Sequence, residues 1–302
     1  MINIEQLSEY GTVLPDEPMR YHTSMRVGGK VKYFITPNDL DSLIELISLL
    51  KDNNEPFMVL GRGSNVIFPD YDMELTIICI YNTLDYIEIE DNFVRVGAGY
   101  SMQKLAKKVS KLGLSGLEYA GGIPGTIAGA VYMNAGAHKG ETKDVVEYVK
   151  TIDLDGIIHE YSNKDCQFSY RHSAFQEKDE IIIEVGLVLE HKDASEVFKR
   201  MSGNLSYRKE LQPLELPSCG SVFKNPENNH AGLMIEQAGL KGYKIGGAEV
   251  STKHANFIVN VNEAKSCDII ELQAYVQKTI KEQFGVELVS EIKIIKGIDA
   301  RK

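Results

Sequence analysis

The stretch AGGIPGTIAGAVYMNAGA, residues 120–137, decides the fold, and a shorter run, VLGRGSNVIF, precedes it at residues 59–68. In each run a strand-like apolar stretch gives way to glycines, which let backbone N–H groups approach a ligand closely. Pro124 and Thr126 are expected to open a helix whose positive end faces an anion. Glycine inside a helix or strand costs about 0.5–1 kcal/mol relative to alanine, so something must offset that cost. Two phosphate cradles predict a large cofactor that carries a diphosphate.

An ordinary dinucleotide-binding turn is the first alternative for the shorter run. Residues 61–66, GRGSNV, nearly match the G-x-G-x-x-G/A fingerprint that follows a strand. The last position holds valine where the fingerprint needs a small residue, and residues 80–82 offer no acid for a ribose hydroxyl. Both departures argue against a Rossmann domain. A plain tight turn at Gly61 and Gly63 remains an open interpretation.

The composition limits the possible function classes. The chain has 302 residues, of which 43% are hydrophobic and 25% charged, as in ordinary globular proteins of two or three subdomains. Its net charge of −10 provides no basic surface for nucleic acid or anionic membrane. The N-terminus lacks a basic segment followed by an apolar core, and no apolar run approaches the roughly 18 residues of a membrane span. We therefore expect a cytoplasmic protein without membrane insertion or nucleic-acid partners.

The cysteines predict neither a metal site nor a disulfide framework. Cys79, Cys166, Cys219 and Cys267 are far apart, and neither C-x-x-C nor a zinc-type Cys/His pair occurs. Free thiols fit a reducing compartment, and we expect no bound metal. The Ser-Cys-Gly-Ser segment around Cys219 also raises the alternative of an acyl-transfer nucleophile, but a G-x-S-x-G elbow is absent, so we interpret Cys219 as a packing residue.

Hydrophobic periodicity predicts an α+β chain with its elements in mixed order. Residues 38–50 read as an amphipathic helix after Pro37, flanked by strands at 31–35 and 56–60. Further helices are expected at 101–112, up to about Lys209, at 231–239 and at 266–284. Further strands are expected at 77–80, 86–89, 93–96, 146–152, 157–161, 181–189, 257–261 and 288–295. Residues 211–221, LQPLELPSCGS, are the best candidate for a linker because of their prolines.

Three polar residues outside the glycine runs are candidates for chemistry. Arg171 lies among aromatic residues in SYRHSAF, Ser221 follows a glycine in SCGSVFKNP, and Glu291 interrupts the apolar run LVSEIKII. Each also has a purely structural explanation. Arg171 would pair with a surface carboxylate, Ser221 would cap the following turn, and Glu291 would point outward from its strand. No one of these residues is decisive alone.

Taken together, these segments resemble the UDP-N-acetylenolpyruvoylglucosamine reductases, FAD flavoenzymes of bacterial cell-wall synthesis. The resemblance covers nearly the whole chain. Its motifs are G-R-G-S-N, A-G-I-P-G-T/S-x-G-G/A with a trailing N-A-G-A, S-Y-R-x-S-x-F, R-x-x-x-Q-P, G-S-V/F-F-K-N-P, G-G-A/V-x-V-S-x-K-H-A and a C-terminal acid. Only a few residues separate Phe175 from Ile181, so the chain resembles the shorter form of the family, which lacks an extra tyrosine-bearing loop.

The resemblance implies an α+β fold, with a two-lobed FAD-binding domain of the vanillyl-alcohol-oxidase type before a smaller α+β substrate-binding domain. The first lobe would comprise residues 1–80, the second 81–210 and the substrate-binding domain 211–286. The C-terminal strand, residues 287–302, would return to the first lobe. The linker candidate at 211–221 agrees with this division.

The resemblance also implies roles for individual residues. Arg171, Ser221 and Glu291 would be catalytic. The residues expected to bind FAD non-covalently are Gly61, Arg62, Gly63, Ser64, Asn65, Gly121, Gly122, Pro124, Gly125, Thr126, Gly129, Asn134 and Gly136. Those expected to bind the UDP-sugar substrate are Lys224, Asn225, Lys241 and His254. In the implied reaction NADPH gives hydride to flavin N5, C3 of the enolpyruvyl ether receives it, and Ser221 protonates C2 to give UDP-N-acetylmuramate.

General chemistry is consistent with these roles. Hydride addition at C3 leaves an enolate-like charge, which fixed positive charge must stabilise. Arg171 can meet a carboxylate through two parallel hydrogen bonds and keeps its proton, while the enolate is basic enough to take a proton from a serine. Two other classes stay open. A flavin oxidase would use oxygen, although residues 61–65 hold no histidine or cysteine for covalent FAD, and a non-catalytic flavin-binding regulator would need no catalytic residues.

Overall fold

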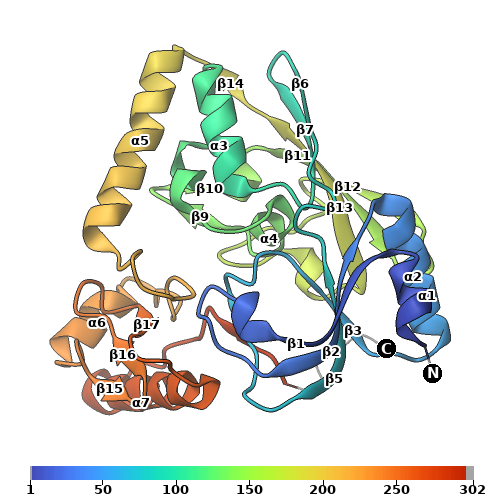
Figure 1. The fold of residues 1–302 in the computed structure, drawn as a ribbon. Coiled ribbons are helices and arrows are strands. Elements are labelled where there is room, and N and C mark those ends of the chain that lie inside the picture. The colour runs from blue at the N-terminus through green and yellow to red at the C-terminus, as the bar shows by residue number, and fades with distance from the viewer. Residues whose placement is uncertain (1, 297–302) are drawn as a thin grey trace.

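A four-stranded sheet organises the first part of the chain in the computed structural model, which describes residues 2–296 (Figure 1). Its strand order is β1-β2-β5-β3, in which β2, β5 and β3 are parallel and β1 is antiparallel to β2. The elements of this unit are α1 (Ile4–Ser8), β1 (Gly11–Pro18), β2 (Lys30–Pro37), α2 (Leu40–Asp52), β3 (Phe57–Leu60), β4 (Val66–Ile67) and β5 (Met73–Cys79).

The predicted β-α-β unit is confirmed with two refinements. Helix α2 begins at Leu40 because the Asp39 carboxylate accepts the N–H of Ser42 at 2.8 Å and so caps the helix. Strand β3 does not lie beside β2, since β5 is inserted between them. The Gly61–Asn65 loop therefore leaves an edge strand, directly after Leu60.

A five-stranded antiparallel sheet forms the second unit, with the order β12-β11-β13-β7-β6. The predicted hairpin at 146–161 is its β11–β12 pair. Helices α3 and α5 pack against each other and against the 3-10 turn η2, on the left of the sheet in Figure 1. The elements are β6 (Ile87–Glu90), β7 (Phe93–Gly97), α3 (Met102–Lys111), β8 (Leu114–Ser115), η2 (Glu118–Gly122), α4 (Ile127–Tyr132), β9 (Gly136–Ala137), β10 (Gly140–Glu141), β11 (Val146–Asp153), β12 (Ile158–Ser162), β13 (Glu180–Val188), β14 (Glu190–His191) and α5 (Ala194–Leu211).

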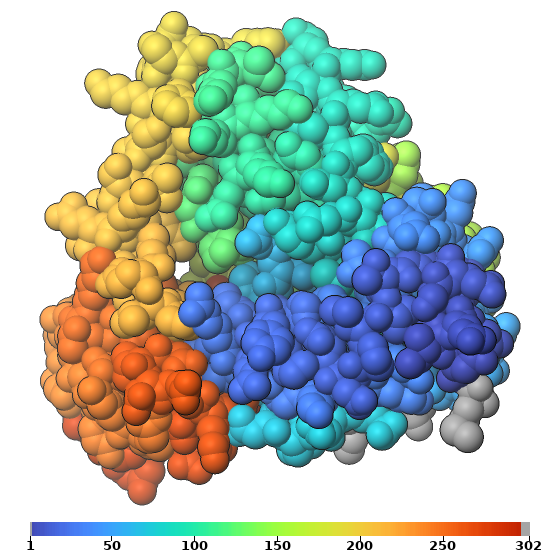
Figure 2. All heavy atoms as spheres, in the orientation of Figure 1, coloured from blue at the N-terminus to red at the C-terminus, as the bar shows by residue number. Residues whose placement is uncertain are grey.

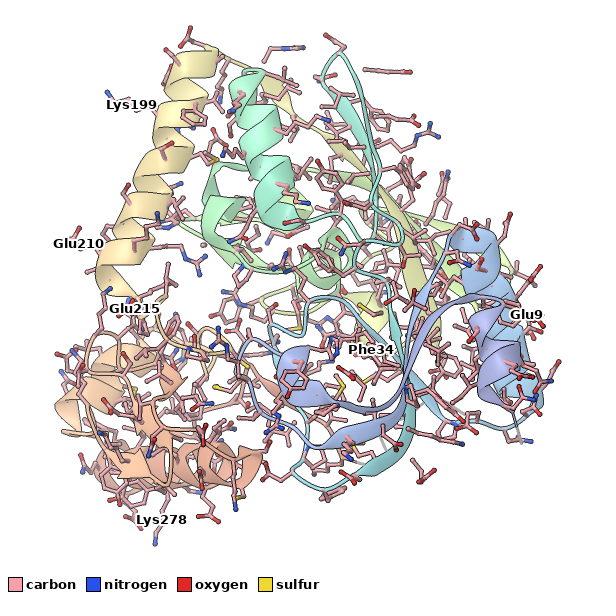
Figure 3. All side chains as sticks on the ribbon, in the orientation of Figure 1. Glu9, Phe34, Lys199, Glu210, Glu215 and Lys278 are labelled. Atoms are coloured by element: carbon pink, nitrogen blue, oxygen red, sulfur yellow. The ribbon has the colours of Figure 1, made fainter. Side chains whose placement is uncertain are left out.

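The third unit is small and combines three antiparallel strands with two helices. Its elements are α6 (Ala231–Gln237), β15 (Lys244–Ile245), β16 (Ala248–Val250), β17 (Ile258–Asn260) and α7 (Ser266–Phe284). Helix α7 has the predicted bounds, and its left-handed C-cap is Gly285. In Figure 2 the orange and red residues of this unit form a mass that adjoins the lower end of α5 and the blue N-terminal unit. Figure 3 shows Glu215 where the chain leaves α5 for this unit.

The predicted strand at 288–295 is mostly wrong. Only β18 (Lys293–Ile294) is a strand, and it pairs in parallel with β4 of the first unit. Before it, Ser290 forms a single bridge with Phe223. Leu288 and Ile292 are buried in the third unit, whereas Ile295 is buried in the first. The segment passes from one core to another and changes partner on the way, which prevents one continuous strand.

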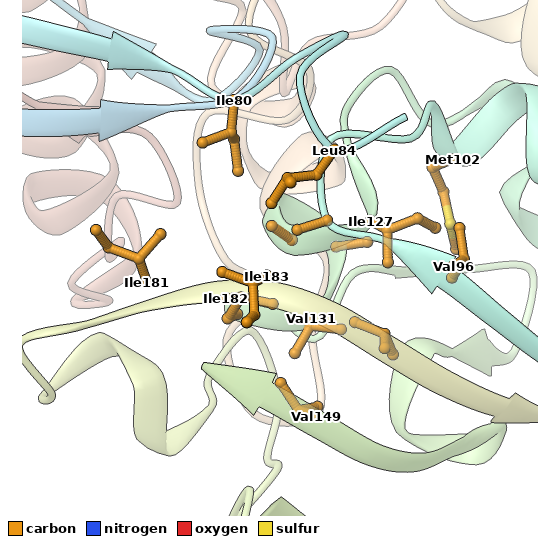
Figure 4. Packing of buried hydrophobic residues seen from close by; sticks show 14 of the residues in the cluster. Ile80, Leu84, Val96, Met102, Ile127, Val131, Val149, Ile181, Ile182 and Ile183 are labelled. Carbon is orange, nitrogen blue, oxygen red and sulfur yellow. The ribbon is translucent and has the colours of Figure 1, made fainter. Parts of the chain in front are cut away.

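Three hydrophobic clusters hold the fold together. The largest joins the helix-covered face of the first sheet to the interior of the second unit, so these two units share one core. Figure 4 shows this core where Ile127 and Val131 of α4 pack near Ile183 of β13. A second cluster, which includes Phe34, labelled in Figure 3, fills the opposite side of the first sheet. The third cluster belongs to the C-terminal unit and also contains Met25 and Val27.

The division of the chain at residues 80, 210 and 286 stays a prediction. No helix within residues 2–296 is both long enough and apolar enough to cross a membrane.

Candidate active site

A cavity of about 610 Å³ lies where the three units meet. Most of the residues predicted from the sequence line it. These are Gly61, Arg62, Gly63, Ser64, Asn65, Pro124, Gly125, Thr126, Gly129, Gly136, Arg171, Ser221 and Glu291. The cavity walls do not include Gly121, Gly122, Asn134, Lys224, Asn225, Lys241 or His254.

The two glycine runs touch each other along one wall of the cavity. The Ser64 hydroxyl donates to the carbonyl of Pro124 at 2.9 Å. A Cβ on Gly61 would lie only 2.7 Å from Oγ1 of Thr126, so this approach requires glycine. Thr126 is the N-cap of α4, because its hydroxyl accepts the N–H of Gly129 at 3.2 Å. The predicted helix start at Pro124 is therefore corrected: α4 begins at Ile127, and Pro124 lies in the preceding loop.

Gly63 has the most restricted backbone in the shorter run. Its φ of +57° is in the left-handed region, and a Cβ would lie 2.1 Å from the carbonyl oxygen of His22. Each of these constraints excludes any residue other than glycine at position 63, unless the local backbone rearranges. The neighbouring Arg62 guanidinium lies over the ring of Tyr81, with Cζ 4.5 Å from the ring centroid, and it donates a hydrogen bond to the Tyr81 hydroxyl at 2.7 Å. The loop thus presents backbone and a guanidinium to the cavity.

Arg171 lies at the tip of a tight turn in which Ser169 and His172 pair through their backbones. Its φ is +57°. The guanidinium donates from Nε to Oε1 of Glu291 at 2.6 Å and from Nη2 to the carbonyl of Gly136 at 3.1 Å. The Arg171 and Glu291 side chains are only 17% and 15% exposed. The two structural alternatives, a surface partner for Arg171 and an outward-pointing Glu291, are therefore wrong.

Glu291 is held on both sides through its backbone. Its N–H donates to the carbonyl of Val222 at 2.8 Å, and its own carbonyl accepts the Asn65 amide at 3.0 Å. Burial raises the pKa of the Glu291 carboxyl, while the positive charges of Arg171 and Lys224 oppose that rise without cancelling it. The site therefore favours the protonated carboxyl more than water does.

This raised pKa gives Glu291 a distinct pH signature. Between the ordinary glutamate pKa of 4.5 and the higher native value, the folded protein binds more protons at Glu291 than the unfolded chain. The free energy of unfolding therefore falls as the pH rises through this window. Urea unfolding at a series of pH values should show a stability difference, wild type minus Glu291→Gln, that declines as the pH rises.

The exposed Glu287 supplies the matched control. Its pairing with Lys281 lowers its pKa, so the difference between wild type and Glu287→Gln should rise with pH instead, by a small amount because both side chains are exposed. A rising difference for Glu291→Gln would show that its pairing with Arg171 outweighs its burial.

Ser221 follows a glycine that keeps the space beside it open. Gly220 has φ +77°, and a Cβ at this position would meet nothing within 4 Å. Ser221 lines the cavity, and its hydroxyl has no hydrogen-bond partner within residues 2–296, so it does not cap a turn. Cys219, two residues before Ser221, is buried, and this burial raises the pKa of its thiol to about 12. A thiol that stays protonated is a poor nucleophile, which agrees with a packing role.

Three of the predicted cofactor residues do not line the cavity but pack against the segments that form it. Cβ atoms on Gly121 and Gly122 would meet the side chains of Met201 and Arg208 on α5, so these glycines permit close packing. Asn134 is fully buried, and its amide donates to Glu141 at 3.1 Å and to the carbonyl of Ser169 at 2.9 Å. Asn134 therefore anchors the turn that carries Arg171.

The four predicted substrate residues lie in the third unit. Lys224 is close enough to act electrostatically on Glu291, whereas Asn225 is exposed and accepts the N–H of Ala231 at 3.1 Å. Lys241 pairs with Glu236 at 2.7 Å. Burial lowers the pKa of His254, and the charge of Lys241 adds to this effect. Their role in binding stays a prediction.

Two cations of the cavity wall were not predicted. Arg208 donates from Nε to Gln212 at 3.0 Å, and Lys293 donates to the Tyr132 hydroxyl at 2.7 Å. Neither pairs with a carboxylate among the described residues. Burial lowers the pKa of Arg208. The R-x-x-x-Q-P motif contains Arg208, but nothing in the local pattern of either residue shows which way its side chain points.

Comparisons with known proteins identify the family. The UDP-N-acetylenolpyruvoylglucosamine reductase of Bacillus subtilis is 42% identical over 290 residues, 96% of each chain. The chain belongs to this reductase family. The reductase of Anoxybacillus flavithermus is 44% identical over 286 residues, 94% of this chain and 95% of that protein. The crystal structure of the Thermus caldophilus reductase superposes with a TM-score of 0.80 at 32% identity, covering 95% of this chain and 99% of that one.

The family assignment agrees with the predicted fold and cofactor class. Residues 212–295 match the C-terminal domain of the UDP-N-acetylenolpyruvoylglucosamine reductases, and residues 31–162 match an FAD binding domain. The predicted α+β fold with an FAD-binding domain is confirmed. The protein is thus a flavoprotein of a reductase family that serves peptidoglycan synthesis. Within residues 2–296 no group of three or more His, Cys, Asp or Glu side chains is placed to hold a metal ion.

Proposed function

We propose that this protein reduces the enolpyruvyl double bond of UDP-N-acetylenolpyruvoylglucosamine to give UDP-N-acetylmuramate, with NADPH as the electron donor and FAD bound non-covalently. One observation carries the proposal: Arg171, Glu291 and Ser221 line the same cavity as residues of both glycine runs, and Arg171 pairs with Glu291 there. The reductases that cover the chain at about 40% identity are named for this substrate. We further propose that the reaction takes place in the cytoplasm, where free thiols are stable.

The residues present fit a flavin dinucleotide. Gly61, Gly63 and Gly125 bring bare backbone to one wall, as diphosphate binding requires. Arg62, Arg208 and Lys293 add positive charge to the cavity, and none of them pairs with a carboxylate among the described residues. When bound, FAD supplies hydride transfer from NADPH to the substrate through its N5 atom.

Arg171 would orient and polarise the substrate carboxylate. Of its five N–H donors, the structure commits one on Nε to Glu291 and one on Nη2 to Gly136, so further donors can meet the substrate. Fixed positive charge stabilises the enolate-like charge that develops as C3 receives hydride. Glu291 would hold the guanidinium in place and, when protonated, donate a hydrogen bond of its own.

Ser221 would deliver the proton to C2. Its hydroxyl lines the cavity next to Gly220, where no side chain crowds the approaching carbon. A serine is a weak acid in water, but the enolate is strongly basic, so proton transfer is favourable once the negative charge has developed. For the uridine diphosphate end we propose Lys224, Asn225, Lys241 and His254, which lie in the third unit beyond the cavity walls.

The flavin itself provides the test of this function. Purified protein should be yellow, NADPH should bleach it without oxygen, and UDP-N-acetylenolpyruvoylglucosamine should restore the colour. Restoration by oxygen alone would indicate an oxidase instead. A yellow protein that NADPH does not bleach would indicate a flavin-binding regulator.

Gly63→Ala tests the proposed cofactor loop. We expect FAD to bind at least about tenfold more weakly, because alanine is strained at φ +57° and its Cβ would collide with the carbonyl of His22. Equilibrium titration of the apoprotein with FAD measures this effect. Gly203→Ala in α5 is the control, since its Cβ would meet nothing within 4 Å, and it should bind FAD like the wild type. Equal affinity for Gly63→Ala would remove the loop from the cofactor site.

A further inference from the structure

The loop between β1 and β2 connects the first unit to the third. Met25 and Val27 leave the first unit and are buried in the hydrophobic cluster of the third, at 0% and 2% exposure. The Asn260 amide on the third unit donates to the carbonyl of Met25 at 3.1 Å. This loop is therefore packed into the third unit, although its ends belong to the first sheet.

Ser24 lies in this loop and bonds to both sides of the cavity. Its backbone N–H donates to the carbonyl of Gly63 at 3.0 Å, in the shorter glycine run. Its hydroxyl donates to the carbonyl of Ser218 at 2.7 Å and lies 3.9 Å from the thiol of Cys219. One residue thus joins the proposed flavin loop to the start of the segment that carries Ser221.

A second anchor holds the other end of that segment. The N–H of Val222 donates to the carbonyl of Asn256 at 2.8 Å, and the carbonyl of Val222 accepts the N–H of Glu291 at 2.8 Å. Gly220 and Ser221 lie between the two anchors. Gly220 has φ +77°, and a Cβ there would meet nothing within 4 Å, whereas the adjacent Cys219 is buried and its thiol donates to the carbonyl of Val66 at 3.6 Å.

We propose that Ser24 is a positioning residue, which sets the Ser221 hydroxyl at a fixed place relative to the Gly61–Asn65 loop. The inference rests on the proposed function of Ser221 as proton donor. Ser24 holds one end of the segment together with the backbone contacts that residues 217 and 218 make to Asn260 and Val259, and Asn256 holds the other end. The glycine between these anchors permits few positions for the hydroxyl. Without the Ser24 bond, the Ser218 carbonyl loses its side-chain partner, so the segment is held less firmly on the side of Gly220 that faces the proposed flavin loop.

The test compares Ser24→Ala with Ser24→Thr, which retains a hydroxyl. Hydrogen–deuterium exchange of the apoprotein reports on the segment without any cofactor. We expect residues 218–221 to exchange several-fold faster in Ser24→Ala and at the wild-type rate in Ser24→Thr. Rapid-mixing kinetics should show flavin reoxidation by the enolpyruvyl substrate slowed about tenfold in Ser24→Ala, with flavin reduction by NADPH and the FAD dissociation constant within about twofold of wild type.

Ser266 provides a matched control. Its hydroxyl donates to the carbonyl of Phe68 at 2.5 Å, so it also joins the third unit to the first, but away from Ser221. Ser266→Ala should lower the melting temperature without changing the ratio of the two half-reactions. Unchanged exchange at 218–221 together with unchanged reoxidation in Ser24→Ala would overturn the inference. If the wild-type flavin itself is not reoxidised by the enolpyruvyl substrate, the proposed function fails instead.

Discussion

Ser221→Ala is expected to leave the reduction of bound FAD by NADPH within about twofold of wild type while slowing reoxidation by the enolpyruvyl substrate by about 10²- to 10⁴-fold. That factor is what a positioned general acid contributes. This split is expected because Ser221 lines the cavity and its hydroxyl has no partner among residues 2–296, so the hydroxyl contributes little to the fold. Anaerobic stopped-flow measurement at the flavin absorption band separates the two half-reactions.

Ser218→Ala is the control for this prediction. Ser218 lies in the same segment, but its side chain is not part of the cavity wall, and the bond from Ser24 is made to its backbone carbonyl, which the substitution keeps. It should behave like the wild type in both half-reactions. Equal losses in the two half-reactions of Ser221→Ala would remove Ser221 as the proton donor, because a defect in flavin placement affects both steps.

The parts of the fold that the sequence predicts well are those in which local chemistry decides the structure. Helix α7 has the predicted bounds because its apolar spacing runs unbroken to Gly285, a glycine that can adopt the left-handed C-cap. The Gly61–Asn65 loop was predictable because a strand ends at a glycine-rich turn. In the structure this loop lines one cavity together with Pro124, Gly125, Thr126, Ala128 and Gly129.

Other features depend on contacts between distant segments, which no local pattern encodes. Glu291 was an ambiguous residue in an apolar run, and only its contact with Arg171, 120 residues earlier, explains why a carboxylate is buried there. Asn134 lies within a glycine-rich run, yet its side chain points away from the cavity and holds the turn of Arg171. The strand predicted at 288–295 is interrupted because its residues are shared between two cores.

Arg171→Lys retains the positive charge but is expected to lower the rate of flavin reoxidation by about 10²- to 10³-fold, a loss typical of removing one preorganised charge-stabilising group. The guanidinium bonds to Glu291 through Nε and to the Gly136 carbonyl through Nη2, and its planar shape keeps further donors at fixed angles for the substrate carboxylate. A lysine ammonium is a single point of charge. The lysine at position 171 would pair with the neighbouring buried Glu291 carboxylate. The substrate carboxylate would then lack its two parallel hydrogen bonds.

Arg95→Lys is the matched control for this substitution. Arg95 is an exposed residue of β7 that pairs with Glu88 on the neighbouring strand, so exchange for lysine should change neither half-reaction. Because lysine keeps the positive charge at both positions, comparing the two variants separates the effect of the guanidinium's shape at position 171 from the effect of its charge. If Arg171→Lys turned over at a near-normal rate, charge alone would be sufficient at this position. The bond between Arg171 and Glu291 would then serve the packing of the turn at residues 169–172 and not the orientation of the substrate.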